Sequence, residues 1–392
     1  MKKYLALILA LLMVFALCAC GDKGGEDPQG GEEATGDLVG VSMPTKDLQR
    51  WNQDGENMKA QLEAAGYQVD LQYGANDIQT QVGQIENMIA NGCKVLVIAA
   101  IDGDSLGTVL AQAKEAGIPV IAYDRLIMNS DAVSYYATFD NWLVGVKQGE
   151  YIEQALDLAN AGDKTFNIEY ITGDPGDNNI NFFFDGAMSV LQKYLDAGTL
   201  VCVSGQTAKM DVATEGWDAG KAQERFETIL STYYADKPLD AVMASNDSTA
   251  QGVAAALETS YTNEVYPIIT GMDCDVLSVE NILEGKQAMS MLFLPNDLAE
   301  KAAEMCIAIL NGEEPEINDT KTYDNGVTKQ YNKKGGLEYT YKKSPNGTVT
   351  KYSKTGRKLE TYKYMSKRFQ SIPNEIKVID NDLKKLSKKT KT

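Results

Sequence analysis

The 392-residue chain contains no histidine. Histidine is the most frequent general acid or base in enzymes and a common zinc ligand, so its absence excludes Ser–His triads and histidine-ligated metal sites. The net charge of −18 argues against nucleic acid as a partner, because phosphates repel an acidic protein. The composition therefore favours a globular protein with a binding role or with histidine-free chemistry.

The first residues of the chain have the order of an export signal. Two lysines precede an apolar run over residues 5–17, which is shorter than the roughly 20 residues that span a bilayer. The run ends in LCAC, which is typical of a bacterial lipobox with Cys20 as the lipidated residue; a plain secretory signal is the alternative. Residues 21–36 are glycine-rich and acidic, which predicts a flexible tether.

Four further cysteines lie far apart, each in apolar surroundings, which favours small core residues over disulfides. They are Cys93, Cys202, Cys274 and Cys306.

From residue 38, short apolar segments alternate with segments of helical periodicity. The expected helices cover residues 46–65, 77–91, 104–116, 180–196, 213–233 and 248–258. Apolar strands such as KVLVIAA, VIAY and AVMA lie between them. This alternation predicts βαβ units, and strands without polar residues predict parallel sheets covered by helices on both faces. We expect an α/β protein with two Rossmann-like lobes of similar size.

Polar residues follow the expected strands, where parallel sheets usually bind their ligands. The segments are PTKDLQRW, DR, GDPGDNN, SND and MD. None has the spacing of a glycine-rich phosphate loop, which disfavours nucleotides. Carboxylates and guanidinium groups form charge-assisted hydrogen bonds with hydroxyl groups, and an indole can pack on the CH face of a pyranose. The segments therefore favour a neutral, polyhydroxylated ligand.

These segments also carry a family resemblance. The chain resembles the periplasmic-type sugar-binding proteins of bacterial ABC transporters, in the multiple-monosaccharide and xylose-binding group. The resemblance runs from Leu38 to about Val327 and rests on RWNQDG, QIENMI, VLVIAAIDG, VIAYDRLI, YYATFDN, DNN, GWD, SND, GMD and NDTKTYDNGV. It implies the type I periplasmic binding protein fold, in which two lobes joined by a multi-strand hinge close on one sugar. The implied N-terminal lobe is 37–139 with 294–320, and the C-terminal lobe is 140–293.

The resemblance also implies the sugar-binding residues, with the two tryptophans enclosing the ring from opposite lobes. They are Arg50, Trp51, Asp124, Arg125, Asn178, Trp217, Asn246, Asp273 and Phe293. Phe293 stands where the family usually has a lysine, which favours a sugar lacking the hydroxyl that this lysine contacts; a one-residue alignment shift is the alternative.

Each of these residues also has a purely structural explanation. Trp51 could belong to the core, Asp124 and Arg125 could form a structural ion pair, and Asn178 or Asn246 could cap a helix. Capping is the role expected for Asp140 and Asn141, outside the ligand site.

The last segment, 321–392, contains the hinge exit and a tail that departs from the family. From residue 328 it is rich in lysine and tyrosine, and Gly-Gly, Asn-Gly and Thr-Gly pairs predict short polar hairpins. Three interpretations are open. The tail could contact an anionic membrane or wall surface, could be a fused or frame-altered end without a role, or could supply the strand that completes the second lobe.

The sequence thus predicts a lipid-anchored, monomeric receptor on the extracytoplasmic face of the membrane. It would bind a monosaccharide without cofactor, metal or catalytic residues and deliver it to an ABC permease. A sugar receptor for chemotaxis or a sensor kinase is the alternative, and a glycoside-processing enzyme is a further one. A sugar-responsive repressor shares the two-lobe fold but needs an N-terminal helix-turn-helix, where this chain has its export signal.

Overall fold

The computed structural model describes residues 36–263, 265–292 and 295–316, together with the backbone of strands between residues 320 and 380. The export signal, Cys20, the tether up to residue 35 and Phe293 lie outside the described residues. Within the described part, no helix is both long enough and apolar enough to cross a membrane.

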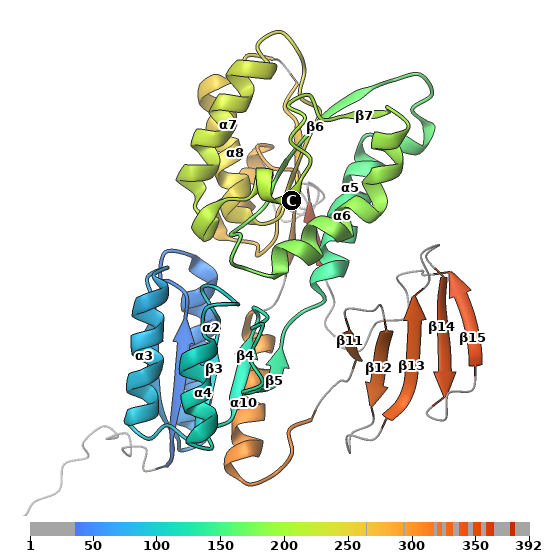
Figure 1. The fold of residues 1–392 in the computed structure, drawn as a ribbon. Helices are drawn as coiled ribbons and strands as arrows, with labels where there is room; N and C mark the ends of the chain where they lie inside the picture. The colour runs from blue at the N-terminus through green and yellow to red at the C-terminus, as the bar shows by residue number, and fades with distance from the viewer. Residues whose placement is uncertain are drawn as a thin grey trace, which may run out of the picture. The chain divides into compact units, whose positions relative to one another are not determined.

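The first sheet has five parallel strands in the order β2-β1-β3-β4-β5 (Figure 1). They are β1 (Leu38–Met43), β2 (Gln68–Tyr73), β3 (Val95–Ile98), β4 (Val120–Tyr123) and β5 (Val133–Ala137). The inner strands β3 and β4 are buried at every residue, because helices cover both faces of the sheet. This is the arrangement that strands without polar residues predict.

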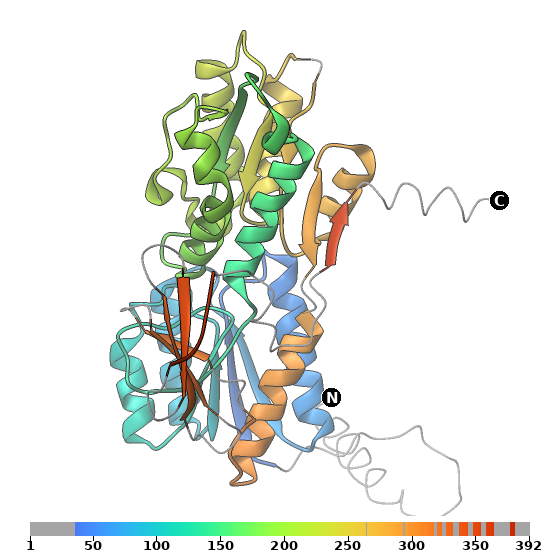
Figure 2. The same ribbon diagram turned by 90° about the vertical axis from the view of Figure 1, so that its right-hand side faces the viewer.

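One face of the first sheet packs against α2 (Gln49–Ala64) and α10 (Pro295–Leu310), and the other against α3 (Ile78–Ala90) and α4 (Gly107–Glu115). Helix α10 comes from much later in the chain yet lies beside α2 in Figure 2. Its small side chains Ala299, Ala302 and Ala303 share a core cluster with Met58 and Leu62 of α2. The chain therefore returns to the first sheet after building the second.

The second sheet has four parallel strands in the order β7-β6-β8-β9. They are β6 (Phe166–Ile171), β7 (Leu200–Val201), β8 (Ala241–Ala244) and β9 (Ile268–Ile269). One face packs against α5 (Asn141–Ala155) and α6 (Asn179–Asp196), the other against α7 (Ala219–Tyr233) and α8 (Asp247–Ser260). Short 3-10 turns lie at Leu158–Asn160, Lys209–Val212 and Glu215–Trp217. The predicted α/β architecture of two lobes is confirmed.

The helix expected over residues 213–233 is interrupted. Gly216 and Trp217 adopt left-handed φ values of 69° and 56°, which an α-helix does not tolerate. Helix α7 begins only after Asp218, whose side chain caps it by accepting from the Lys221 N–H at 2.8 Å.

After β9 the chain forms α9 (Val276–Glu284) and β10 (Met289–Leu292), returns to the first sheet with α10, and then reaches the tail. Five tail strands form an antiparallel meander (Figure 1): β11 (Thr320–Tyr323), β12 (Val327–Tyr331), β13 (Leu337–Lys343), β14 (Thr348–Ser353) and β15 (Lys358–Lys363). The hairpins expected from the turn residues agree with these pairings.

The last strand of the tail, β16 (Lys377–Asp380), pairs antiparallel with β10 (Figure 2). The two strands form a two-stranded sheet of their own, apart from the four strands of the second sheet. All three interpretations of the tail stay predictions.

All four described cysteines are free thiols. Two are buried and two are partly buried, as expected of residues that pack without forming disulfides.

Candidate functional site

A cavity lies where the carboxyl ends of strands from both sheets meet. The space between its walls is about 420 Å³ when the part open to solvent is included. Its lining is Leu48, Arg50, Trp51, Asp124, Arg125, Asp177, Asn179, Phe183, Trp217, Asn246, Ser248, Met272, Asp273 and Asp275. The carboxyl ends of parallel strands thus bring together residues more than 200 positions apart.

The cavity contains most residues that the sequence assigned to a ligand. Those residues are Arg50, Trp51, Asp124, Arg125, Trp217, Asn246 and Asp273. Phe293 lies outside the described residues. Asn178 is not part of the lining: its Nδ2 donates to the Leu126 carbonyl at 3.3 Å, and its neighbour Asn179 occupies the cavity wall instead.

Arg50 is the centre of an acidic cluster. Its Nη2 donates to Asp124 Oδ2 at 2.5 Å, its Nε donates to Asp54 Oδ2 at 3.2 Å, and its Nη1 lies 3.9 Å from Asp273 Oδ1. Burial alone lowers the pKa of Arg50, but these three carboxylates outweigh burial and raise it, so the guanidinium stays charged. Burial raises the pKa of Asp54 to about 7, with Arg50 opposing the rise.

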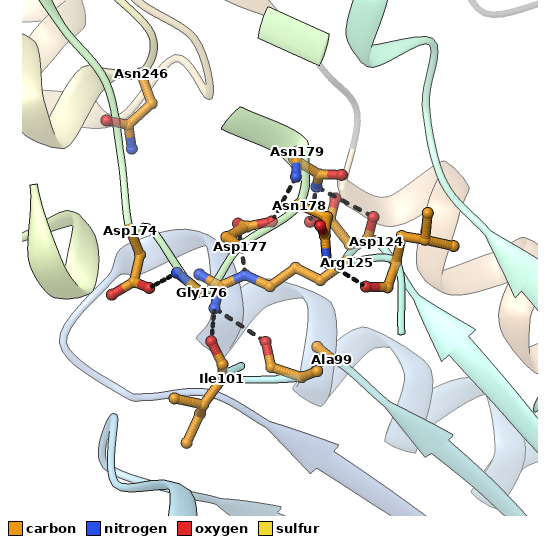
Figure 3. A network of polar contacts seen from close by, with 12 residues as sticks. Ala99, Ile101, Asp124, Arg125, Asp174, Gly176, Asp177, Asn178, Asn179 and Asn246 are labelled. Atoms are coloured by element: carbon orange, nitrogen blue, oxygen red, sulfur yellow. Dashed lines mark hydrogen bonds and ion pairs between the residues drawn. The ribbon is translucent and has the colours of Figure 1, made fainter. Parts of the chain in front are cut away.

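Asp124 and Arg125 do not pair with each other, contrary to the structural alternative. Arg125 Nε lies 2.9 Å from Asp177 Oδ2, and Arg125 Nη1 donates to the Ala100 and Ile101 carbonyls at 3.0 and 3.4 Å (Figure 3). Asp124 has a left-handed φ of 60°, so the chain turns sharply after β4 and sends the two side chains to different partners.

Asn179 connects the second sheet to the end of β4. Its Nδ2 donates to the Asp124 carbonyl at 3.2 Å (Figure 3). Its Oδ1 accepts from Asn141 Nδ2 at 2.9 Å. Asp140 caps α5 through the Leu143 N–H at 3.0 Å, as expected. The expectation for Asn141 was wrong, because its side chain supports Asn179 and hence the site.

The two tryptophans contribute apolar surface to opposite parts of the lining. The Trp51 ring lies 4.7 Å from Arg50 Cζ and 5.1 Å from Arg125 Cζ, within the range of cation–π contacts. Trp217 packs edge-to-face on Phe183, with ring centroids 6.2 Å apart. Both tryptophans are almost fully buried, so Trp51 is at once part of the core and part of the cavity wall.

Asn246 also has two roles. Its Oδ1 caps α8 by accepting from the Thr249 N–H at 3.0 Å, and its Nδ2 donates to Asp273 Oδ2 at 3.4 Å. Asp273 is held in a left-handed conformation with φ 104°. Burial raises the pKa of its carboxyl well above the usual value, and Arg50 opposes this rise.

Three buried polar atoms of the lining have no hydrogen-bond partner among the described residues. They are Asp273 Oδ1, an acceptor, and the donors Trp217 Nε1 and Arg125 Nε, of which Arg125 Nε lies in an ion pair with Asp177. Buried polar atoms nearly always have partners, because an unpaired one costs about 1–3 kcal/mol. The cavity therefore offers at least one acceptor and one donor to a ligand. Among the described residues, no acidic or cysteine side chains are grouped as metal ligands.

Sequence reasoning missed several lining residues: Asp177, Asn179, Phe183, Ser248, Met272 and Asp275. Each follows a strand within a few residues of a predicted position. The signal was therefore the loop after each strand together with the first turns of the following helix, since Asn179, Phe183 and Ser248 lie in α6 and α8.

A cavity between two parallel sheets, lined by carboxylates, guanidinium groups and indoles, defines a two-lobe solute-binding protein. The chain belongs to the periplasmic binding protein domain family, whose model matches residues 39–314.

Among characterised relatives, it is 50% identical over 292 residues to the multiple sugar-binding periplasmic receptor ChvE of Rhizobium radiobacter. The match covers 74% of this chain and 82% of that protein. It is 34% identical to the D-xylose-binding periplasmic protein of Escherichia coli, with 72% and 80% covered.

Two solved structures are similar to this chain. An ABC transporter solute-binding protein from Clostridium phytofermentans with bound β-D-glucose is 61% identical, with a TM-score of 0.72 over 77% of this chain and 90% of that one. A carbohydrate transporter solute-binding protein from Chloroflexus aurantiacus in complex with D-glucose is 32% identical, with a TM-score of 0.65 over 73% and 88%. They confirm the family and the fold that the sequence resemblance implied.

Proposed function

We propose that the protein is an extracytoplasmic solute-binding protein that captures a monosaccharide between its lobes and delivers it to an ABC permease. The observation that carries this proposal is the convergence of Arg50, Asp124, Arg125, Asp273 and the two cavity tryptophans on one buried cavity. Relatives that bind sugars in transport systems support it.

The lining can satisfy a sugar without catalysing a reaction. Each hydroxyl group donates and accepts, so Asp273 Oδ1 can accept from one hydroxyl while Arg50 or Arg125 donates to another. The ion pairs keep both guanidinium groups oriented toward the cavity. A pyranose between Trp51 and Trp217 would bury its CH faces, which adds the apolar part of the binding energy.

The two-lobe mechanism assigns residues 37–139 and 294–320 to one lobe and 140–293 to the other. The return of α10 to the first sheet and the start of α5 at Asn141 support these boundaries. Closure of the lobes around the sugar would exclude water from the hydrogen bonds, and the permease would recognise the closed form.

Calorimetric titration of the mature chain with a panel of pentoses and hexoses tests the proposal. D-glucose and D-xylose are the first ligands to try, since relatives bind them. Heat that saturates at one sugar per chain is the expected result. The absence of heat with every monosaccharide would contradict it.

Attachment to the membrane through lipidated Cys20 and the tether completes the proposal, with the protein acting as a monomer. Cells expressing the full chain should incorporate radiolabelled palmitate into it and retain it in the membrane fraction. Cys20→Ser should lose both properties, whereas Cys18→Ser should keep them. Equal labelling of the two variants would favour a plain secretory signal.

A sugar receptor for chemotaxis or a sensor kinase would bind the sugar in this same site. Only the partner protein distinguishes such a receptor from a transport protein. Loss of sugar uptake on deletion of the gene favours transport, and loss of the taxis or signalling response alone favours a receptor.

A glycoside-processing enzyme would release product from aryl glycosides. Asp124 and Asp273 both contact the Arg50 guanidinium, so these carboxyls are engaged within the wall of the cavity.

A further inference from the structure

Trp217 lies in a backbone conformation that needs support from its surroundings. It follows Gly216, and both residues have left-handed φ values. A residue with a bulky side chain is strained in this region, and the conformation persists only where neighbouring groups impose it. The contacts of this segment therefore identify what places the indole at the cavity.

Several hydrogen bonds hold the segment, among them one from the Trp217 N–H to the Thr214 carbonyl at 3.1 Å. Asp174 Oδ2 accepts from the Gly216 N–H, and the Thr214 N–H donates to the Gly173 carbonyl at 2.9 Å. Ser248 Oγ donates to the Trp217 carbonyl. Of these, only the carboxylate of Asp174 bonds the residue immediately before Trp217.

Gly173 fixes the position of the indole by lacking a side chain. A Cβ built on Gly173 would lie 2.1 to 2.2 Å from three atoms of the Trp217 indole. The ring therefore lies directly against the Gly173 backbone, and any other residue there would push it toward the cavity or out of the site.

The second oxygen of Asp174 connects this segment to the other lobe. Asp174 Oδ1 accepts from the Gly176 N–H at 2.7 Å (Figure 3), and the Gly176 carbonyl accepts from the Gly103 N–H at 3.0 Å. Gly103 follows β3 of the first sheet. One carboxylate thus bonds both the loop that contacts the opposite lobe and the loop that carries Trp217.

We propose that Asp174 is a positioning residue that couples the contact between the lobes to the placement of the Trp217 indole, with Gly173 as the surface on which the ring lies. Asp174 is not part of the cavity lining, so it acts on the ligand through Trp217. The identity of the ligand, a monosaccharide, rests on the proposed function. The placement of the Trp217 ring does not depend on that function.

The test combines Asp174→Asn with Trp217→Phe in a double-mutant cycle for D-glucose affinity. Asparagine has a similar shape but carries an NH2 group in place of one oxygen, so it cannot accept at both of the positions where Asp174 accepts from an N–H. We expect Asp174→Asn to weaken binding roughly tenfold in the wild-type background and to have little further effect in Trp217→Phe. Independent, additive losses in the two backgrounds would overturn the proposal.

A second readout follows the indole without any sugar. The chain has three tryptophans, so 5-fluorotryptophan labelling gives three ¹⁹F resonances that single Trp→Phe variants assign. Asp174→Asn and Gly173→Ala should each shift or broaden the Trp217 resonance and leave that of Trp142 in place. An unchanged Trp217 resonance in both variants would overturn the proposal.

Asp240→Asn is the matched control. Asp240 Oδ2 also accepts from a backbone N–H of the second lobe, that of Asn167 at 2.6 Å, but outside the cavity lining. It should change neither the Trp217 resonance nor the affinity. If the wild-type chain bound no sugar at all, the proposed function would fail, whereas the ¹⁹F comparison would still decide whether Asp174 places the ring.

Discussion

Arg50 Nη2 and Asp124 Oδ2 lie 2.5 Å apart, although 74 positions separate the two residues in the chain. The first turn of α2 and the end of β4 thus share a buried ion pair at the wall of the cavity. Because Asp54 and Asp273 also face this guanidinium, Arg50 is the charge on which the acidic wall depends.

Asp124→Asn should weaken D-glucose binding by at least about tenfold and lower the free energy of unfolding by about 1–3 kcal/mol. The amide can no longer form a charged hydrogen bond with Arg50, and it leaves the Asn179 contact without its carboxylate. Calorimetry and urea unfolding measure the two effects.

Asp131→Asn is the control for this change. Asp131 forms an ion pair with Lys114, but its side chain is 87% exposed, so its loss should matter little. Equal sugar affinity of Asp124→Asn and the wild type would contradict a role of the pair in binding.

Arg125→Lys should weaken sugar binding although the charge is kept. The guanidinium bonds the Asp177 carboxylate with Nε and two carbonyls with Nη1, and a single ammonium group cannot reproduce that geometry. We expect a loss of about tenfold or more by calorimetry. Lys114→Arg is the control, because it makes the opposite exchange in an exposed ion pair, and it should bind the sugar with wild-type affinity. Wild-type affinity of Arg125→Lys would show that only the positive charge of residue 125 matters for binding.

Stability should depend on pH through Asp247. Burial raises the pKa of this carboxyl to about 7, while Gln287 opposes the rise. The folded state then binds the proton more tightly than the unfolded state, so the stabilisation is complete below the unfolded pKa near 4 and declines as pH rises toward 7. One carboxyl group of this kind changes the free energy of unfolding by at most about 1.4 kcal/mol per pH unit.

Asp247→Asn removes this titration. Urea unfolding between pH 5 and 7.5 should therefore show a smaller decline in stability for the variant than for the wild type. Carboxyls with lowered pKa values, such as Asp77 and Asp131, act at lower pH and do not interfere. Parallel curves for the two proteins would mean that Asp247 is ionised in both states.

Phe293→Lys should change either the sugar affinity or the ranking of sugars. A lysine can donate to a hydroxyl group that phenylalanine cannot bond. Titration of both proteins with the same pentoses and hexoses measures the ranking, and Phe293→Leu controls for loss of the ring. Identical affinities and ranking in Phe293→Lys would place residue 293 outside the site.

The fold class and the neighbourhood of the site could be predicted from the amino-acid pattern alone. Apolar strands alternating with amphipathic helices allow few arrangements other than parallel sheets covered on both faces, and parallel sheets place their strand ends at one edge. Local signals sufficed for caps such as Asp140 and Asn246, because a cap bonds an N–H only three residues away.

The tertiary structure decided which side chains meet. Asp124 and Arg125 are adjacent in sequence, but the left-handed turn at Asp124 gives them separate partners on α2 and in the loop after β6. Asn179 replaced Asn178 at the cavity for a similar reason. The direction of a side chain after a strand depends on loop dihedrals and on contacts between distant segments, and neither leaves a local pattern in the sequence.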